Sequence, residues 1–251
     1  MAVLQMNNNT SPNNIPVIRT LLNADYTSTH EAMLNTTLSR IENKKQGIIT
    51  PNEIWVVEHN DVYTLGQAGK EEHILHRGNT PVIQTDRGGQ VTWHGKGQLV
   101  LYWLIDLNEA SWTVRDMVSH AEQSLEDILN SCLSRDSRGQ SFYAKSRRDA
   151  PGVYIYNNED LMLGKIASLG FKIKHGFSYH GIALNLTCDL AAFNAINPCG
   201  YAGMQMLKLE DFANLESTPD TGIFNLEVTK QMLSNIQQRL AGEIELRPSN
   251  N

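Results

Sequence analysis

Two neighbouring segments decide the fold of this chain: LMLGKIASLGFKI, residues 161–173, and YHGIALNL, residues 179–186. Both are rich in apolar residues, and a short polar stretch with a glycine separates them, which is the pattern of a pair of strands. We expect the first strand to bend at its glycines. Lys165 stands in a stretch otherwise poor in polar residues, so its amine is predicted to point into a pocket.

The sequence on either side alternates between helical and strand periods. Strands are predicted over residues 53–59, 81–85, 90–94, 99–107 and 152–156. Helices are predicted from about Asn23 to Gly47, along the apolar stripe from Val114 to Cys132 with Ser111 or Thr113 as its cap, and over residues 224–240. This order indicates an α/β fold, an α+β arrangement of a mixed sheet with flanking helices, and not a regular βαβ winding. The face predicted for the first helix consists of Tyr26, His30, Met33, Leu34, Leu38 and Ile41.

The length of 251 residues suits one domain. Residues 1–16 have neither a basic start nor an apolar stretch, so we expect a flexible tail there and a single catalytic domain over residues 17–251. No run approaches the roughly 18 apolar residues of a membrane-spanning helix. The sequence therefore predicts no membrane partner.

Charge and cysteine content narrow the function further. The formal net charge of −6 gives no basic excess for displacing counterions from phosphates, so nucleic acid is not predicted as a partner. Three cysteines are an odd number and have no framework spacing, which indicates a reducing cytoplasm. We expect a cytoplasmic monomer.

The turn Asn197-Pro198-Cys199-Gly200 suggests an activated thiol. A thiol attacks as its thiolate, and a fixed cation such as Lys165 beside Cys199 would favour that form. The alternative is a small buried cysteine. Cys132 lies on a helical apolar stripe and is interpreted as core packing, and Cys188 is assigned no role.

Four blocks in one order carry a resemblance to a known family. They are Arg87–Gly95 (RGGQVTWHG), the Lys165 segment, Tyr179–Asn185 and Pro198–Gly200. The chain from about Thr64 to Gly200 resembles the octanoyltransferases of lipoate biosynthesis, the lipoate-protein ligase B family of lipoyl(octanoyl) transferases. The resemblance implies a catalytic domain with the fold of biotin and lipoate protein ligases.

The resemblance also implies an activity. An octanoyl or lipoyl group would pass from acyl carrier protein through a thioester on Cys199 to a lysine of the lipoyl domains of 2-oxoacid dehydrogenases or of the glycine cleavage H protein. Lys165 would lower the pKa of Cys199. The substrate pocket would be lined by Arg87, Gly88, Gly89, Gln90, Val91, Thr92, Trp93 and His94, by Ser168, Leu169 and Gly170, and by Gly181, Ile182 and Ala183.

The chemistry calls for no cofactor. Exchange of one thioester for another is nearly balanced and aminolysis is downhill, so no ATP is required, and two easy steps replace one hard step. Backbone amides near the Cys199 turn would form the oxyanion site. His175 and His180 have the spacing of half a zinc site, but no Cys-x-x-Cys accompanies them and no metal is predicted.

Two other functions remain open. An ATP-dependent lipoate or biotin protein ligase would share the fold without a nucleophilic thiol at Cys199, and a non-catalytic protein would only bind acyl chains or lipoyl domains. Separately, a basic cluster suggests a surface that steers the acidic carrier protein, although a solvated loop accounts for it equally well. This cluster comprises Arg135, Arg138, Lys145, Arg147 and Arg148.

Overall fold

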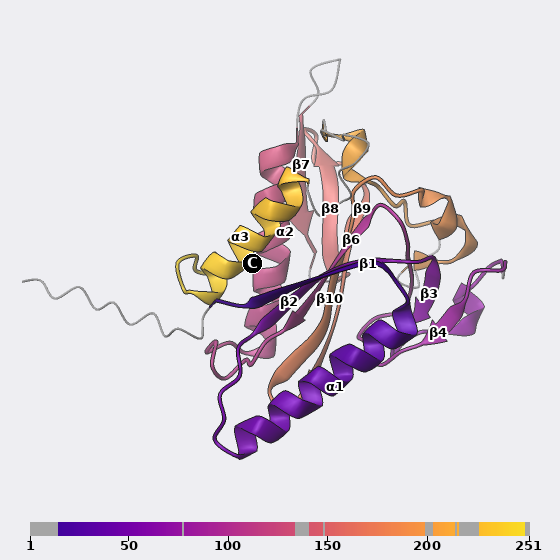
Figure 1. The fold of residues 1–251 in the computed structure, drawn as a ribbon. Coiled ribbons are helices and arrows are strands. Elements are labelled where there is room, and N and C mark those ends of the chain that lie inside the picture. The colour runs from indigo at the N-terminus through magenta and orange to yellow at the C-terminus, as the bar shows by residue number, and fades with distance from the viewer. Residues whose placement is uncertain are drawn as a thin grey trace, which may run out of the picture.

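A seven-stranded mixed sheet forms the centre of the computed structural model, which describes residues 15–76, 78–133, 141–147, 149–198, 203–213, 215 and 226–248 (Figure 1). In the described part of this sheet, the edge strand β1 pairs in parallel with its neighbour β2, and all other neighbouring strands are antiparallel. The predicted mixed sheet with flanking helices is confirmed. In spatial order the strands are β1 (Val17–Ala24), β2 (Glu53–His59), β6 (Gln98–Leu104), β10 (Phe177–Asn185), β9 (Met162–Lys174), β8 (Gly152–Asn157) and β7 (Phe142–Ser146).

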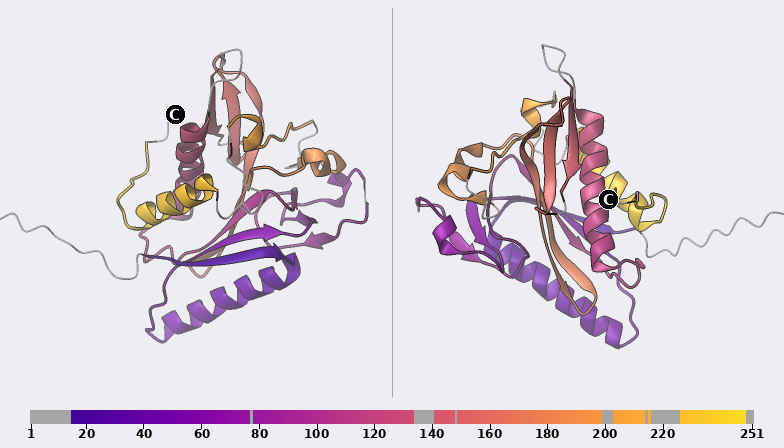
Figure 2. Two further views of the ribbon diagram at one scale, coloured as in Figure 1. Left: turned by 45° about the horizontal axis from the view of Figure 1, so that its top comes forward. Right: turned by 180° about the vertical axis from the view of Figure 1, so that it is seen from behind.

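The central strands are buried on both faces, which explains their nearly continuous apolar sequence. In β6, Leu99, Leu101 and Trp103 belong to the larger core, whereas Val100 and Tyr102 belong to a second core on the opposite face. This alternation follows from the two-residue period of a strand. Helix α1 (Tyr26–Lys45) covers one face, and α2 (Val114–Cys132) lies beside α3 (Glu227–Leu240) on the other (Figure 2).

Helix α2 begins where the sequence predicts. The Thr113 side chain accepts from the Asp116 N–H at 3.1 Å, and the Asp116 carboxylate accepts from the Thr113 N–H at 2.8 Å. This capping box satisfies two amides that have no partner within the helix. Cys132, at the end of α2, packs against the larger core as predicted.

Helix α1 differs from its predicted apolar face. Tyr26, Met33 and Ile41 are buried, but Leu38 is 39% exposed. Thr37 and Arg40 take buried positions instead, and the Arg40 guanidinium donates to the Leu104 carbonyl at 2.6 Å. A buried guanidinium needs such partners, which apolar periodicity does not reveal. The helix begins at the cap residue Asp25 and is followed by Gly47 at φ +75°.

A small second sheet lies beside the large one. It consists of β4 (Val82–Gln84), β3 (Val62–Leu65) and β5 (Val91–His94), with β3 in the middle. Val91 and Trp93 of β5 pack into a separate cluster with Phe193, which lies in the 3₁₀ helix Leu190–Ala195. The remaining side chains of β5 are therefore available to face the large sheet.

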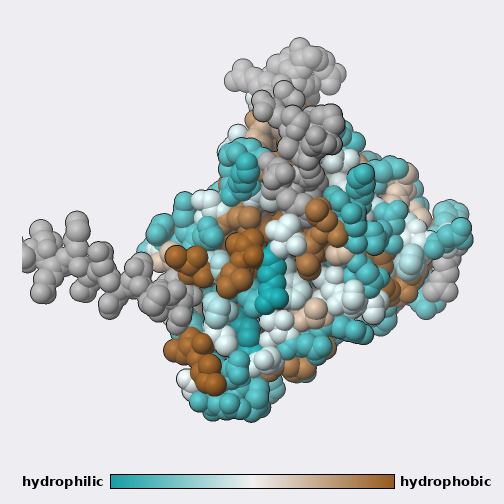
Figure 3. Space-filling view, viewed as in Figure 1, coloured by the Kyte–Doolittle hydropathy of each residue, from teal (hydrophilic) through white to brown (hydrophobic). Residues whose placement is uncertain are grey.

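The sequence analysis predicted most elements but not β1, β3 and β7. Strand β1 is an edge strand with mostly exposed side chains, so its apolar pattern is weak. The predicted tail lies almost entirely outside the described residues, which begin at Ile15. Within them, none of the helices has the length and apolar character needed to cross a membrane. The face in Figure 3 shows separate hydrophobic patches among polar side chains.

Candidate active site

A pocket of about 500 Å³, its open mouth included, lies where β9 and β10 meet β5 and the loop before it. All of the predicted lining residues except Gly88 and Trp93 contribute to it. The other wall residues are Tyr26 from α1, Val100 and Tyr102 from β6, and His180 from β10. The predicted residues that line the pocket are Arg87, Gly89, Gln90, Val91, Thr92, His94, Ser168, Leu169, Gly170, Gly181, Ile182 and Ala183.

Close packing of backbone explains two of the glycines in the wall. A Cβ on Gly170 would lie 2.9 Å from the Gly88 carbonyl oxygen, and one on Gly181 would lie 1.9 Å from the Leu101 carbonyl oxygen. Gly170 and Gly181 are also paired across β9 and β10. Glycine at both positions lets the 87–90 loop approach one side of the pair and β6 the other.

Arg87 organises the loop that covers the pocket. Its guanidinium donates to the Thr64 carbonyl at 2.7 Å, the Gln90 carbonyl at 2.8 Å and the Gly88 carbonyl at 2.9 Å. The Gly88 N–H donates to the Phe171 carbonyl at 3.2 Å, which ties this loop to β9. Trp93 points away from the pocket, and its ring meets Phe193 edge-on with centroids 5.6 Å apart. Alternation along β5 accounts for that placement.

Lys165 is buried beside Gly152 of β8 and is not among the residues that line the pocket. Its side chain is 1% exposed, and its ammonium donates to the Pro151 carbonyl oxygen at 2.8 Å. The ammonium also lies 5.5 Å from the centre of the Tyr154 ring, which offers a cation–π contact. The amine is therefore buried, while its predicted orientation into a pocket stays a prediction, since Lys165 does not line the pocket described above.

Gly152 makes room for the lysine. A Cβ at Gly152 would lie 2.4 Å from Cε and 2.7 Å from Nζ of Lys165, and the φ of +143° disfavours any other residue. The Gly152 N–H donates to the Glu122 carboxylate, which lies on α2. Burial raises the pKa of Glu122 to about 7, and the charge of Lys165 acts in the opposite direction. Glu122 therefore places a titratable carboxyl next to this lysine.

Cys199 lies outside the described residues, as does Gly200. The chain that follows is described: the Gln205 carbonyl accepts from the Lys165 N–H at 2.8 Å, and the Leu207 N–H donates to the Lys165 carbonyl at 2.8 Å. Cys188 is fully buried, and burial raises the pKa of its thiol to about 12. Burial also raises the pKa of the Cys132 thiol. The described thiols are thus poor nucleophiles at neutral pH.

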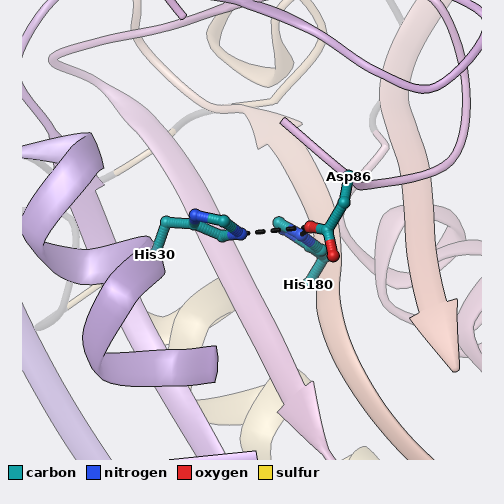
Figure 4. A group of neighbouring side chains, drawn as sticks. All are labelled: His30, Asp86 and His180. Atoms are coloured by element: carbon teal, nitrogen blue, oxygen red, sulfur yellow. Dashed lines mark hydrogen bonds and ion pairs between the residues drawn. The ribbon is translucent and has the colours of Figure 1, made fainter. Parts of the chain in front are cut away.

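A polar cluster joins α1, the loop before β5 and β10 (Figure 4). His30 Nε2 lies 3.1 Å and His180 Nε2 lies 2.9 Å from the same Asp86 carboxylate oxygen, and the Tyr179 hydroxyl donates to the other oxygen. These hydrogen bonds, chiefly the one from His180, lower the pKa of Asp86. Burial lowers the pKa of His180 to about 4 despite Asp86. At neutral pH, an uncharged imidazole therefore donates to an ionised carboxylate.

His30, Asp86 and His180 also have the composition of a metal site, since their ligand atoms lie within 4.8 Å of one another. However, the separations of 2.9 and 3.1 Å are those of hydrogen bonds. A metal on His180 Nε2 would move the proton to Nδ1, which is buried with no partner among the described residues. Metal-bound histidines normally donate from that second nitrogen, so the geometry favours a hydrogen-bonded network.

The sequence patterns did not predict four of the residues that line the pocket, and each omission has a physical reason. Tyr26 was assigned only to a helix face, and Val100 and Tyr102 only to a strand. Their contribution depends on which strand lies beside β10, and sequence periodicity does not fix that. His180 directly precedes Gly181, so its place in the predicted block was the available signal.

Only part of the predicted basic cluster can be located. Arg135, Arg138 and Arg148 lie outside the described residues. Arg147 donates to the Asp149 carboxylate at 3.1 Å, so its charge is partly neutralised. Lys145 is exposed on β7 and forms no ion pair with any residue that the structure describes.

Comparison with known sequences places these features in context. The lipoyl protein ligase A/B catalytic domain matches residues 29–234. An octanoyltransferase of Psychrobacter cryohalolentis is 56% identical over 92% of this chain and 92% of its own length. That of Acinetobacter baylyi is 46% identical over 74% of this chain and 76% of its own length.

Solved structures show the same fold at low sequence identity. LipL1 of P. falciparum in complex with lipoate has a TM-score of 0.57 at 11% identity, over 94% of this chain and 64% of that chain. A bipartite lipoate protein ligase of Thermoplasma acidophilum has a TM-score of 0.55 at 12% identity, over 92% of this chain and 86% of that chain. These likenesses concern the fold of the domain.

Proposed function

Since this chain belongs to the lipoyl protein ligase A/B catalytic-domain family, we propose that it transfers an octanoyl group from acyl carrier protein to a lysine of a lipoyl domain. One structural observation supports this proposal independently of the names of the relatives. A partly apolar pocket lies along β9 and β10, and Ser168 in its wall pairs with Gly152, which adjoins the buried ammonium of Lys165. This arrangement suits an acyl chain with its reactive end near the lysine.

In the first step, the Cys199 thiolate attacks the carbonyl carbon of the carrier thioester. A new carbon–sulfur bond forms, the bond to the carrier sulfur breaks, and that sulfur takes a proton from the Lys165 ammonium. Lys165 is suited to this role because its amine is held at a fixed position by the Pro151 carbonyl. A fixed cation stabilises the thiolate before the reaction and the departing thiolate during it.

In the second step, the amine of the acceptor lysine attacks the acyl-enzyme. The carbon–nitrogen bond forms, the bond to Cys199 sulfur breaks, and Lys165 in its neutral form takes the proton from nitrogen. Both groups thereby return to their starting states, and neither ATP nor a cofactor enters. Glu122 adjoins Lys165 and would adjust the charge of the lysine without contact with the acyl group.

The pocket supplies affinity for the chain. Val100, Leu169, Ile182 and Ala183 provide apolar wall. Each buried methylene contributes about 0.8 kcal/mol, so several methylenes account for substantial binding. Arg87, with its donors directed to the covering loop, supports the wall and does not recognise a charged group of the substrate.

The experiment is transfer from octanoyl-loaded carrier protein to a purified lipoyl domain, with and without ATP. We expect equal transfer in both conditions and a hydroxylamine-labile octanoyl adduct on the enzyme by intact-mass spectrometry. Cys199→Ala should abolish adduct and transfer, whereas Cys132→Ala, which removes a thiol at the edge of the core, should keep both.

The same assay separates the two rival functions. Transfer that requires free octanoate and ATP would identify a ligase, the activity named for the Thermoplasma acidophilum protein of the same fold. Binding of chain and lipoyl domain without turnover, unaffected by Cys199→Ala, would identify a non-catalytic binding protein. Either result would overturn the proposed transfer.

A further inference from the structure

A groove between α2, the end of β7 and the segment after α3 reaches the residues that hold Lys165. Its lining includes Glu122 and Glu126 of α2 and Pro151, which directly precedes β8. Among the described residues, it shares none of its lining with the pocket along β9 and β10. Pro151 is the residue whose carbonyl oxygen accepts from the Lys165 ammonium. The Glu122 side chain and the residue that holds Lys165 therefore line the same groove.

A single peptide group links Glu122 to Lys165. Its carbonyl oxygen, from Pro151, accepts from the Lys165 ammonium at 2.8 Å, and its N–H, from Gly152, donates to the Glu122 carboxylate. None of the described peptide bonds is cis, and in a planar trans peptide the C=O and the N–H point in opposite directions. The carboxylate and the ammonium therefore lie at the two ends of one peptide dipole, each at the end of opposite sign.

This order of charges makes the two hydrogen bonds support each other. A hydrogen bond that polarises a peptide N–H also makes the carbonyl oxygen of the same peptide a better acceptor. Hydrogen bonds to an ionised group are also shorter and stronger than those between neutral groups. An ionised carboxylate on Glu122 therefore strengthens the contact between the Pro151 carbonyl and the Lys165 ammonium.

Contacts on both sides of this peptide keep it from turning. The Tyr154 hydroxyl donates to the Ala150 carbonyl at 2.9 Å, and the ring of the same tyrosine lies with its centre 5.5 Å from the Lys165 ammonium. On the other side, Gly152 pairs with Ser168, which belongs to the wall of the pocket. Because both neighbours of the peptide are held, its carbonyl stays directed at the ammonium.

The surroundings of Glu122 make its charge sensitive to pH near neutrality. Burial raises its pKa to about 7, Glu126 acts in the same direction, and the charge of Lys165 acts in the opposite direction. Above about pH 7 the Glu122 carboxyl is therefore mostly ionised, and below that pH it is mostly neutral. The other charged residues that line the groove are Arg115 on α2, Lys145 on β7, Arg147 after β7 and Arg247 after α3.

We propose that Glu122 is a positioning residue for Lys165 and acts through the Pro151–Gly152 peptide. In its ionised form it fixes the ammonium in place and stabilises the positive charge there, and on protonation this effect is lost. The inference rests on the proposed function for its effect on transfer, since Lys165 is the group that gives and takes the proton in that reaction. Glu122 does not line the pocket, so it should affect the rate of transfer and not the binding of the acyl chain.

The pairing can be measured without any transfer. In protein labelled with ¹³C at the glutamate side-chain carboxyl, the Glu122 resonance is the one that Glu122→Gln removes, and its chemical shift against pH gives the pKa of Glu122. Lys165→Met removes the charge at the other end of the peptide, so we expect this pKa to rise by about half a unit or more. Lys174→Met, at an exposed position of the same strand, should leave it unchanged. An unshifted Glu122 titration in folded Lys165→Met would overturn the proposal.

Transfer kinetics at pH 8 test the consequence for the reaction. Glu122→Gln keeps an oxygen that can accept from the Gly152 N–H but loses the charge, and Glu122→Leu loses both. We expect kcat for octanoyl transfer to fall about threefold in the first variant and about tenfold or more in the second, with an unchanged KM for the loaded carrier protein. Glu126→Gln is the matched control, because Glu126 lines the same groove and also accepts a backbone N–H, from Ser146 at 2.7 Å. Its kcat should equal that of the wild type.

The pH dependence of kcat separates an effect of charge from a merely structural one. The wild-type kcat should show a step near pH 7, lower on the acid side where Glu122 takes up its proton, and Glu122→Gln should lack this step. A pH profile unchanged by Glu122→Gln, or full kcat in a folded Glu122→Leu variant, would overturn the proposal. If Lys165→Met raises the pKa of Glu122 while the wild-type protein transfers no octanoyl group, the proposed function alone is refuted and the pairing of Glu122 with Lys165 stands.

Discussion

The Lys165 ammonium donates to the Pro151 carbonyl oxygen at 2.8 Å, and this contact fixes a buried positive charge beside the pocket. The proposed mechanism depends on that position. Lys165→Met keeps much of the side-chain volume and removes the charge. We expect the apparent pKa of Cys199 to rise by about one unit or more, since a neighbouring cation lowers a thiol pKa by an amount of this order.

The rate of alkylation by iodoacetamide between pH 5 and 10, followed by mass spectrometry of the Cys199 peptide, measures this shift. The same variant should lose at least tenfold in octanoyl transfer at pH 7. Lys174→Met is the control, because it removes an exposed lysine from the same strand. Identical alkylation profiles for Lys165→Met and the wild type would contradict the pairing of lysine and thiol.

The space left by Gly152 supports a second prediction. In Gly152→Ala the new methyl group would collide with Lys165 Cε and with the Ala167 carbonyl oxygen. We expect a loss of stability of about 1–3 kcal/mol and a reduction in transfer of at least tenfold, because the amine must move. Urea unfolding and the transfer assay measure the two effects.

Gly47→Ala is the matched control for backbone strain. Gly47 has a φ of +75°, and a Cβ there would meet no atom within 4 Å. It should therefore lose stability of about 1–2 kcal/mol from the left-handed conformation alone and retain full transfer. Full activity of stable Gly152→Ala would show that the amine does not need its present position.

The buried histidines predict how stability depends on pH. Burial lowers the pKa values of His59, His120 and His180 to about 4, and it also lowers the pKa of His94 well below its usual value. As the pH falls below about 6.5, the unfolded chain takes up protons on these rings while the folded protein does not. Stability should therefore be lost between pH 6.5 and 4. Glu122 acts in the opposite sense, since its raised pKa lets the folded state take up a proton first.

His120→Gln tests this linkage away from the pocket. The His120 ring is buried and stacks on Trp112 with centroids 4.0 Å apart. The variant should lower the slope of unfolding free energy against pH by up to about 1.4 kcal/mol per pH unit in this window, the contribution of one proton. Urea titrations at intervals of half a pH unit measure the slope. Equal slopes for the two proteins would mean that His120 titrates alike in both states.

Lys145 provides a test of carrier steering within the described part of the basic cluster. Lys145→Glu should raise the KM for the loaded carrier protein severalfold at low salt and less at 0.15 M salt, since screening weakens long-range attraction. Lys230→Glu makes the same change in net charge at an exposed position on α3. If the KM for the loaded carrier protein rose equally in both variants, or in neither, the result would contradict steering by the surface around Lys145.

Local sequence patterns predicted the elements whose burial is periodic. Strand β2 and helix α2 lie where their apolar spacing indicates, and the cap is Thr113, one of the two expected residues. Edge strand β1 has too little buried surface to show a pattern, and buried Arg40 depends on the Leu104 carbonyl from a distant strand. Such pairings arise from tertiary contacts, which residue periodicity does not encode.

The residues of the pocket also divide into those that local sequence blocks predict and those that depend on tertiary contacts. Its glycine-rich loop and the β9–β10 walls were evident from the ordered blocks, and their residues do line one space. Tyr26 and Tyr102 come from elements that meet the pocket only after α1 and β6 are placed. The partner of His180, Asp86, lies 94 residues away in sequence, so no local pattern could connect them.

The tip of the β9–β10 hairpin has a consequence for how this protein can change over evolution. His175 and Gly176 both have positive φ, +49° and +82°, as in a two-residue turn of type I′. That turn sets the register of every later pair in the hairpin, and inserting one residue would exchange the two faces of a strand. A Cβ at Gly176 would lie 2.9 Å from the Asn108 side chain, so glycine is needed there as well. The exposed His175 would thus tolerate replacement by residues that accept a positive φ far better than the tip would tolerate any change in its length.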